Sequence, residues 1–384
     1  MKHLFIPFGS LLFSALFSLN SYSQGCVAIR PMSCSSTNAN SLNILEKGAL
    51  QFSTNYQYFK SFRHFRGSHQ EKERIENNTQ VENFSHSFEL RVEYGVTSRL
   101  SASISIPYLS YSRTSLYEHY GNSLDRNPDQ LRFETNSNGL GDIRINTNFW
   151  LFDPLNSDSK GNIALGLGIK LPTGNENVQG NFHKRSSIDQ DSIVTKAVDQ
   201  SIQLGDGGFG IIFQYQAMRK LFKGTLFYSN GFYMSNPMTE NTTLARGTLL
   251  NVNPIIAYHS IPDQFAIRAG LNQTVSKVHG LSFSLGARFE GVPSHDLIGS
   301  SNGYRRPGHV LSAEPGISYA HKALNFGLSV PTAVYRNRVK SVYDLSDPLG
   351  ERHGDAAFAD YLVNFTFSYR IHPTKKDSHQ PMND

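Results

Sequence analysis

Apolar and polar residues alternate one by one along most of the chain, and this period of two constrains the fold more than any other feature. From residue 361 to 371 every odd position is apolar or aromatic, whereas the even positions are mostly polar. The same alternation runs through 88–94, 142–149 and 281–290. Because successive side chains of a strand point to opposite faces, the pattern predicts strands with one apolar face and one polar face. No long stretch after residue 24 shows the helical period of 3.6 residues, so we expect an all-β protein.

The polar face carries charge on strand after strand, and the segments are long enough to cross a bilayer at a tilt. Buried charge suits a wet lumen better than the dry centre of a soluble sandwich. We therefore predict a transmembrane antiparallel up-and-down β-barrel. The candidate lumen-lining residues are Glu89, Arg91, Glu93, Asp142, Arg144, Lys170, Arg268, Arg288, Glu290, Glu314 and Arg370. They either form a permeation path or, as we favour because both signs are present, a ladder of mutually paired charges.

The lengths of the connections alternate as in outer-membrane barrels, with long external loops and short periplasmic turns. Six long and five short connections separate twelve predicted strands, and ten or fourteen strands are the alternatives because 249–258 is also strand-like. The strands are expected near 49–65, 83–95, 99–114, 140–152, 162–172, 207–219, 223–235, 264–276, 281–292, 308–320, 325–338 and 360–371.

The N-terminus has the features of a secretory signal: a basic start, an apolar run and small residues near position 23. We expect residues 1–23 to be a signal peptide and 24–48 to be a periplasmic segment or a small hatch. The barrel would then span 49–371, with a polar tail at 372–384. Cys26 and Cys34 are a candidate disulfide, because export to an oxidising compartment permits one; lipidation of Cys26 is the weaker alternative. This organisation predicts the outer membrane of a Gram-negative cell.

Little in the sequence points to catalysis or to a cofactor. The net charge of +5 is spread out, which argues against a nucleic-acid partner, and two cysteines cannot form a four-cysteine zinc site. His295 lies five or more residues before Ser300-Ser301-Asn302-Gly303, a spacing that does not place a base beside its nucleophile on one strand. Seven loop residues resemble metal ligands in type but not in spacing, so we expect loop packing and no metal: His295, Asp296, His309, Asp344, His353, Asp355 and Asp360.

Membrane lipid is the expected surrounding of such a barrel. Tyr108, Trp150, Tyr258 and Tyr369 are expected at its interfacial girdles, and the loop aromatics Phe182 and Tyr304 are alternative guides for an apolar ligand. Four arginines near the external loops make lipopolysaccharide phosphate a candidate partner: Arg305, Arg306, Arg336 and Arg338. The oligomeric state is left open.

Several phrases resemble the family of outer-membrane barrels named for the meta-pathway of phenol degradation, which is related to the fatty-acid-channel barrels. They include Gly139–Ile143, Gly168–Gly174, Ser329–Pro331, Glu290–Pro293, Asp296–Gly299, Tyr304–Gly308 and His353–Asp360. The resemblance covers about 49–371 and implies a transporter of small hydrophobic or aromatic solutes. We expect passive passage of such a solute, since no nucleotide-binding motif is present. The alternative is a structural or surface-interaction barrel with a blocked lumen.

Overall fold

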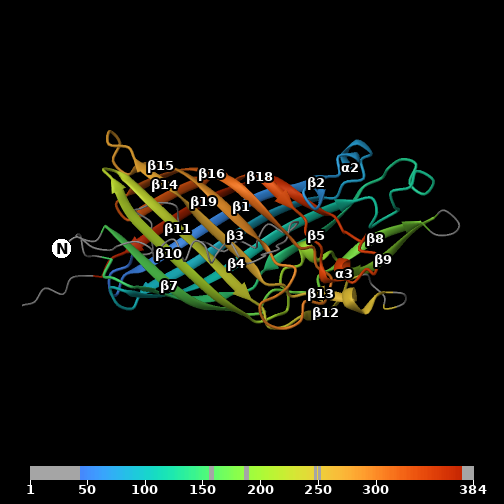
Figure 1. Cartoon of the computed structure of the whole chain (residues 1–384), viewed down its shortest axis with the longest axis horizontal. Helices are drawn as coiled ribbons and strands as arrows, with labels where there is room; N and C mark the ends of the chain where they lie inside the picture. Colours follow the sequence, from blue (N-terminus) through green and yellow to red (C-terminus); the bar gives the residue numbers. More distant parts are fainter. Residues whose placement is uncertain (1–43, 155–159, 186–189, 246–248, 250–251, 374–384) are drawn as a thin grey trace, which may run out of the picture.

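Most strands of the chain form one closed antiparallel sheet, shown in Figure 1 as an elongated barrel, and two further sheets have two strands each. The computed structural model describes residues 44–154, 160–185, 190–245, 249 and 252–373. The predicted signal peptide, most of the 24–48 segment, both cysteines and most of the tail lie outside these residues.

Fifteen strands make up the sheet, and they amount to twelve spans. β5 and β6 are two halves of one span beside β4, β17 and β18 are two halves of another between β16 and β19, and β2 is a two-residue addition. The spans are β1 (Leu50–Arg66), β3 (Glu82–Gly95), β4 (Leu100–Ser115), β5 (Phe133–Leu140) with β6 (Arg144–Trp150), β7 (Gly161–Lys170), β10 (Gly210–Phe222), β11 (Thr225–Ser235), β14 (Gln264–Thr274), β15 (Leu281–Val292), β16 (Gly308–His321), β17 (Leu324–Ser329) with β18 (Thr332–Asn337), and β19 (Ala356–Ile371).

The last strand pairs with the first, from Leu50 opposite Ile371 to Phe65 opposite Ala356, and this pairing closes the ring. The all-β fold and the twelve-strand closed barrel are therefore confirmed. One predicted boundary was wrong: the fourth span begins at Phe133 rather than near 140 and is interrupted at 141–143. The ambiguous 249–258 region is not a span, since its described part holds the short 3-10 helix η2 (Pro254–Ile256) and the start of β13 (Tyr258–Ser260).

The short turns lie at one end of the barrel, where β1 also begins and β19 ends. The long connections lie at the other end. We call these the short-turn end and the long-loop end. Figure 1 shows the small elements gathered at the long-loop end. They are β2 (His69–Gln70), α2 (Glu73–Glu76), the hairpin of β8 (Gln179–Arg185) and β9 (Asp191–Ala197), η1 (Gln200–Ile202), β12 (Glu240–Leu244), η2, β13 and α3 (Val342–Leu345). The described helices have three or four residues each, and none is long and apolar enough to span a membrane.

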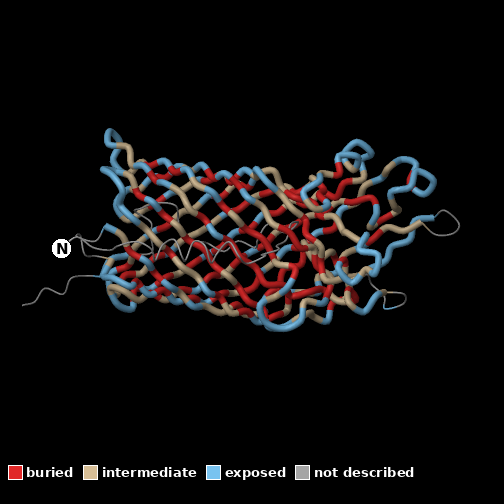
Figure 2. The backbone as a smooth tube through the Cα atoms, in the orientation of Figure 1, coloured by how far each residue is buried: buried red, intermediate tan, exposed pale blue. Residues whose placement is uncertain are grey.

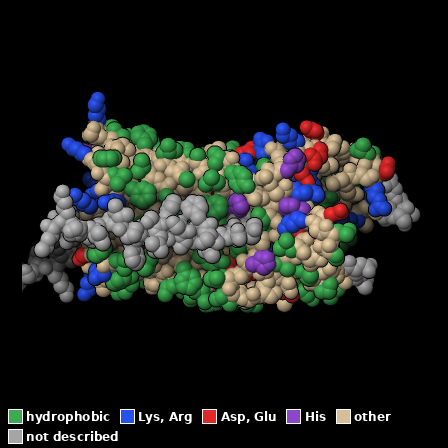
Figure 3. Space-filling view, viewed as in Figure 1, with side chains coloured by type: hydrophobic (Ala, Val, Ile, Leu, Met, Phe, Trp, Pro, Cys, Tyr) green, Lys and Arg blue, Asp and Glu red, His purple; other side chains and the backbone are tan. Residues whose placement is uncertain are grey.

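The two faces of the wall differ as the alternation predicts. Buried and exposed residues alternate along the strands in Figure 2, and apolar side chains cover much of the outer wall in Figure 3, with charged groups toward the ends. Outward-facing Phe283 and Leu285 are 50% and 65% exposed, whereas their inward-facing neighbours Ser282 and Ser284 are buried. An apolar exterior without free sheet edges satisfies what a bilayer demands of a spanning structure.

Candidate functional site

The candidate lumen-lining residues lie on the inner face or in the loops that close it. All are buried except Arg370, which is half-buried. Ten stand on the strands themselves, and Asp142 lies in the break between β5 and β6. Whether they line a solute path stays a prediction.

Their charges pair across the interior. Arg144 on β6 reaches past β4 to bind Glu89 on β3. In the same way Arg268 on β14 reaches past β15 and donates to Glu314 on β16, with Nε 2.8 Å from Oε2. Further contacts include Arg91–Glu93, Arg288–Glu290, Lys170–Asp206, Arg370–Gln51 and Asp142 with the Gly174 N–H. The interior therefore carries both signs in balance, and the side chains fix one another in place.

Amide side chains occupy the wall between these ion pairs. Asn146, Asn148, Gln216, Asn230 and Asn272 all point inward and are buried, and we call them the amide belt. Within the described part of the chain, several of their polar atoms have no hydrogen-bond partner, including both polar side-chain atoms of Asn272. A buried amide without a partner costs free energy, which entry of water or a polar solute would recover.

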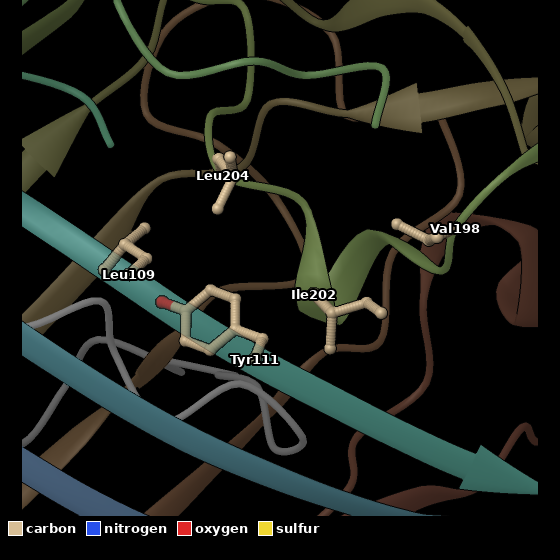
Figure 4. Close-up of a cluster of buried hydrophobic side chains, with 5 residues drawn as sticks. All are labelled: Leu109, Tyr111, Val198, Ile202 and Leu204. Carbon is tan, nitrogen blue, oxygen red and sulfur yellow. The ribbon is translucent and has the colours of Figure 1, made fainter. Parts of the chain in front are cut away.

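In the connection between β7 and β10, residues 198–206 fold back against the inner wall of the barrel near the long-loop end. Val198, Ile202 and Leu204 are almost fully buried and pack on Leu109 and Tyr111, which project from the inner face of β4 (Figure 4). We call residues 198–206 the inward segment. It was missed in the sequence analysis, although two apolar residues on the otherwise serine-rich inner face of β4 were a signal for a partner inside the barrel.

Two glycine-rich stretches of the chain, 139–143 and 168–174, hold the C-terminal end of the inward segment in place. The Thr173 hydroxyl donates to the Gly141 carbonyl at 2.9 Å and accepts the Ile143 N–H at 2.8 Å, which bridges the break between β5 and β6. Gly205 passes so close to Gly174 that a Cβ on it would lie 2.2 Å from the Gly174 carbonyl oxygen. The segments 139–143 and 168–174 thus meet at this anchor.

Asp199 fixes the N-terminal end of the inward segment. Its carboxylate accepts hydrogen bonds from Arg306, with Nη1 2.9 Å from Oδ1, and lies 3.6 Å from Arg113. Burial alone would raise the pKa of Asp199, but the two guanidinium groups outweigh it and hold that pKa well below its usual range. The carboxylate is therefore ionised throughout the physiological range, and the segment is fastened to two walls.

A cavity of about 330 Å³ lies at the long-loop end, beside the Arg113–Asp199–Arg306 contact. A void of only about 20 Å³ lies inside the barrel between the inward segment and the charged side chains of the wall. The larger cavity is lined by His64, Arg74, Val81, Arg113, Tyr117, Asn122, Tyr304, Arg306, Asp355, Ala356 and Ala357. These residues come from six separate stretches of the chain, and no local sequence pattern indicated that they meet.

Among the loop residues considered as metal ligands, the four aspartates contact cationic or imidazole side chains. Within the residues that the structure describes, no three His, Cys, Asp or Glu side chains gather as ligands would. The four carboxylates of the set bind cationic or imidazole groups: Asp296 with Arg305, Asp344 with Arg338, Asp355 with His64 and Arg74, and Asp360 with Arg63 and Arg336. The four arginines considered for lipopolysaccharide are thereby paired with carboxylates, Arg306 through Asp199, and that partner stays a prediction. His295 is near Ser301 in sequence, but the Ser301 hydroxyl accepts the Asp296 N–H.

The aromatic girdle was only partly predicted. Tyr108 and Tyr369 face outward, at 49% and 43% exposed. Trp150 instead points inward and is 2% exposed, because the even-numbered residues of β6 face the interior. Tyr258 lies in β13 among the loops, and Phe182 is buried in the β8–β9 hairpin region.

No protein-family model matches the chain, and the comparison with curated proteins found no match. Solved structures similar to the chain include the translocator domain of the autotransporter NalP from Neisseria meningitidis, with 10% identity, a TM-score of 0.43, and coverage of 86% of this chain and 91% of that one. The P. putida toluene transporter TodX has 10% identity and a TM-score of 0.39, with 91% and 96% covered. The Ralstonia pickettii toluene transporter TbuX has 11% identity and a TM-score of 0.36, with 93% and 99% covered. Likenesses this weak carry no argument about family or solute, so the family resemblance remains a prediction.

Proposed function

We propose that the protein is an outer-membrane channel that lets small solutes pass passively, with the inward segment as its constriction. The observation that carries this proposal is a closed barrel with an apolar outer wall and a polar inner wall, against which a segment of the chain folds back. An apolar skin around a polar interior is typical of barrels that conduct. A loop held by a few side chains can be displaced without breaking the sheet.

Conductance in planar bilayers tests the constriction. Ile202 is 1% exposed and packs on the inner wall, so Ile202→Asp would bury a carboxylate among apolar side chains and expel the segment. We expect larger or more frequent channel openings than in the unaltered protein. The matched control is Ile193→Asp on β9, in the same connection but 58% exposed, which should leave conductance unchanged. Absence of conductance in the unaltered protein and in a folded Ile202→Asp variant would refute the channel.

The expected preference for hydrophobic or aromatic solutes belongs to the same proposal. Only the family resemblance in the sequence supports this preference. The amide belt and the ion pairs would lack hydrogen-bond partners beside an apolar solute, which disfavours its passage. Uptake into liposomes by the Ile202→Asp variant separates the two solute classes. Both rates are taken above those of protein-free liposomes, because toluene also crosses the bilayer itself. A larger protein-dependent entry of toluene than of glucose supports the hydrophobic preference, and the reverse order assigns the channel to polar solutes.

A barrel with a blocked lumen, acting in surface interactions or envelope structure, is the second candidate function. It is favoured by the near-complete burial of the inner side chains, such as Glu89, Glu93 and Glu314, each 1% exposed. In that case neither Ile202→Asp nor removal of the Arg268–Glu314 pair by a double alanine substitution would produce conductance. The same bilayer experiment therefore decides between the two.

A further inference from the structure

The cavity at the long-loop end has a built lining that the channel proposal does not explain. It opens among the external loops, and its volume lies in the range of small-molecule sites. Its walls come from the end of β1, from α2, from the end of β4 and the loop after it, from the loop before β16 and from the start of β19. Elements distant in sequence thus cooperate to keep this space open.

Three arginines line the cavity, and carboxylates fix each of them. Arg74 donates to Glu71 at 2.8 Å and contacts Asp355 at 3.0 Å. Arg113 binds Glu118 through Nε at 2.9 Å, and Arg306 binds Asp199. Since Glu71 also binds Arg66, four arginines face four carboxylates. Of these groups, the three arginines and Asp355 line the cavity, whereas Glu71, Glu118, Asp199 and Arg66 lie outside its lining. The lining arginines are thus neutralised by carboxylates that already bind them, so the site as a whole has little net attraction for an ion.

Acceptors share the lining with these donors. Asp355 accepts from His64 Nδ1, because His64 Nε2 already accepts the Val81 N–H at 2.9 Å. Burial would raise the pKa of Asp355, but the hydrogen bond from His64 and the charge of Arg74 outweigh it and lower the pKa to about 2. The carboxylate is therefore an acceptor at any physiological pH. The exposed amide of Asn122 adds one more acceptor and two donors.

Two tyrosine rings complete the cavity. The Tyr117 hydroxyl accepts from Arg113 at 2.9 Å, which holds a side chain that is nevertheless 45% exposed. Tyr304 is half-buried and lies under the Arg306 guanidinium, 5.1 Å from the ring centre. An oriented ring with accessible surface packs against the C–H face of a ligand, while neighbouring polar groups bind its hydroxyls.

We propose that this cavity binds a neutral, polyhydroxylated solute of about the size of a hexose. Balanced charge disfavours an anion, which would compete with four carboxylates for the guanidinium groups. The number of polar groups disfavours an apolar solute, which would leave them without partners. A sugar offers hydroxyls that donate and accept, together with C–H faces for the rings. The proposal rests on the proposed function only in taking the long-loop end as the external one.

Saturation-transfer NMR with D-glucose tests the site on the refolded full chain, in micelles of a detergent without a sugar headgroup. We expect a saturable glucose signal from the unaltered protein. Tyr117→Ala removes the accessible ring and should weaken binding by about tenfold or more. The matched control is Tyr343→Ala on α3, a half-buried tyrosine whose ring also lies beside a guanidinium, that of Arg352 at 4.1 Å, but away from the cavity. This control should bind glucose as the unaltered protein does.

Circular dichroism checks that each variant folds. If Tyr117→Ala does not, Asn122→Ala at an exposed loop position replaces it and should also weaken glucose binding. The proposal is overturned if glucose gives no saturable signal, if the Tyr343 and Tyr117 variants lose it equally, or if inorganic phosphate displaces it competitively, which would indicate an anion site. Binding in micelles does not require passage and conductance does not require glucose, so the sugar site and the channel fail separately.

Discussion

At the residue scale, His119 shows how burial makes a single side chain sensitive to acid. It is 3% exposed, stacks on Phe182 with ring centres 5.3 Å apart, and its Nδ1 accepts the His183 N–H at 3.1 Å. Burial lowers its pKa from 6.5 to about 4, against the opposing charge of Glu118. The contact joins the loop after β4 to the β8–β9 hairpin.

We expect the contact between His119 and the β8–β9 hairpin to weaken as the pH falls from 6.5 toward 4. In this range His119 is protonated when the contact is open but stays neutral when it is buried in the contact. The stabilisation is complete above the ordinary pKa and declines below it, by about 2 kcal/mol near pH ~5. Hydrogen exchange of the hairpin amides measures the effect. His119→Phe should remove the pH slope, and His279→Phe at the exposed short-turn end should keep it. A slope that survives His119→Phe would assign it to another group.

Ile145 tests which face of the wall meets lipid. It is outward-facing and 40% exposed, at the second residue of β6 and within the β5–β6 span. Ile145→Arg should lower the free energy of unfolding in lipid vesicles by about 2–4 kcal/mol. The control on the opposite face is Asn146→Ser, where the amide oxygen has no partner within the described chain, so the loss should stay below about 1 kcal/mol. Equal losses in denaturant titrations would mean that the two faces are wrongly assigned.

At the scale of elements, the break between β5 and β6 depends on one hydroxyl. Thr173→Val keeps the shape of the side chain but removes both hydrogen bonds to the break, leaving the Ile143 N–H without its acceptor. We expect a loss of about 1–3 kcal/mol in the free energy of unfolding. Thr173→Ser retains the hydroxyl and should lose less. Chemical denaturation of both variants in the same lipid compares them directly, and indistinguishable values would contradict this role of the hydroxyl.

The sequence predicted the spans but not the structure that fills them. Alternation located the twelve spans because each must keep one face apolar against the bilayer. It missed β5, because residues 134–139 carry no apolar side chain on either face and give no such signal. It also missed the inward segment, whose apolar residues Val198, Ile202 and Leu204 follow no regular period and pack on β4, far away in sequence. Contacts of that kind are set by the closed wall and not by local pattern.

At the scale of the whole molecule, the barrel stays closed only if each strand pairs with both of its neighbours, and we call each such strand pairing a seam. Val363 on β19 lies opposite Tyr58 on β1 at the closing seam. Val363→Pro removes a ladder N–H in a strand that has a neighbour on each side, and a bilayer offers no substitute donor. We expect this variant to fail to insert into lipid vesicles, whereas Val363→Ala should insert normally. Protection from added protease reports insertion, and normal insertion of the proline variant would show that the seam tolerates a gap.

The pairing of β1 with β19 has a consequence for biogenesis. Every other seam joins neighbours along the chain, but here Arg370 contacts Gln51 across 319 positions. Such a long-range contact carries the largest loop-closure entropy and forms only after the entire polypeptide has been delivered. A translation product that stops early would expose two unpaired rims and become a template for aggregation. Closure of the ring therefore depends on the sixteen-residue strand β19, and the chain must be kept from aggregating until that strand pairs with β1.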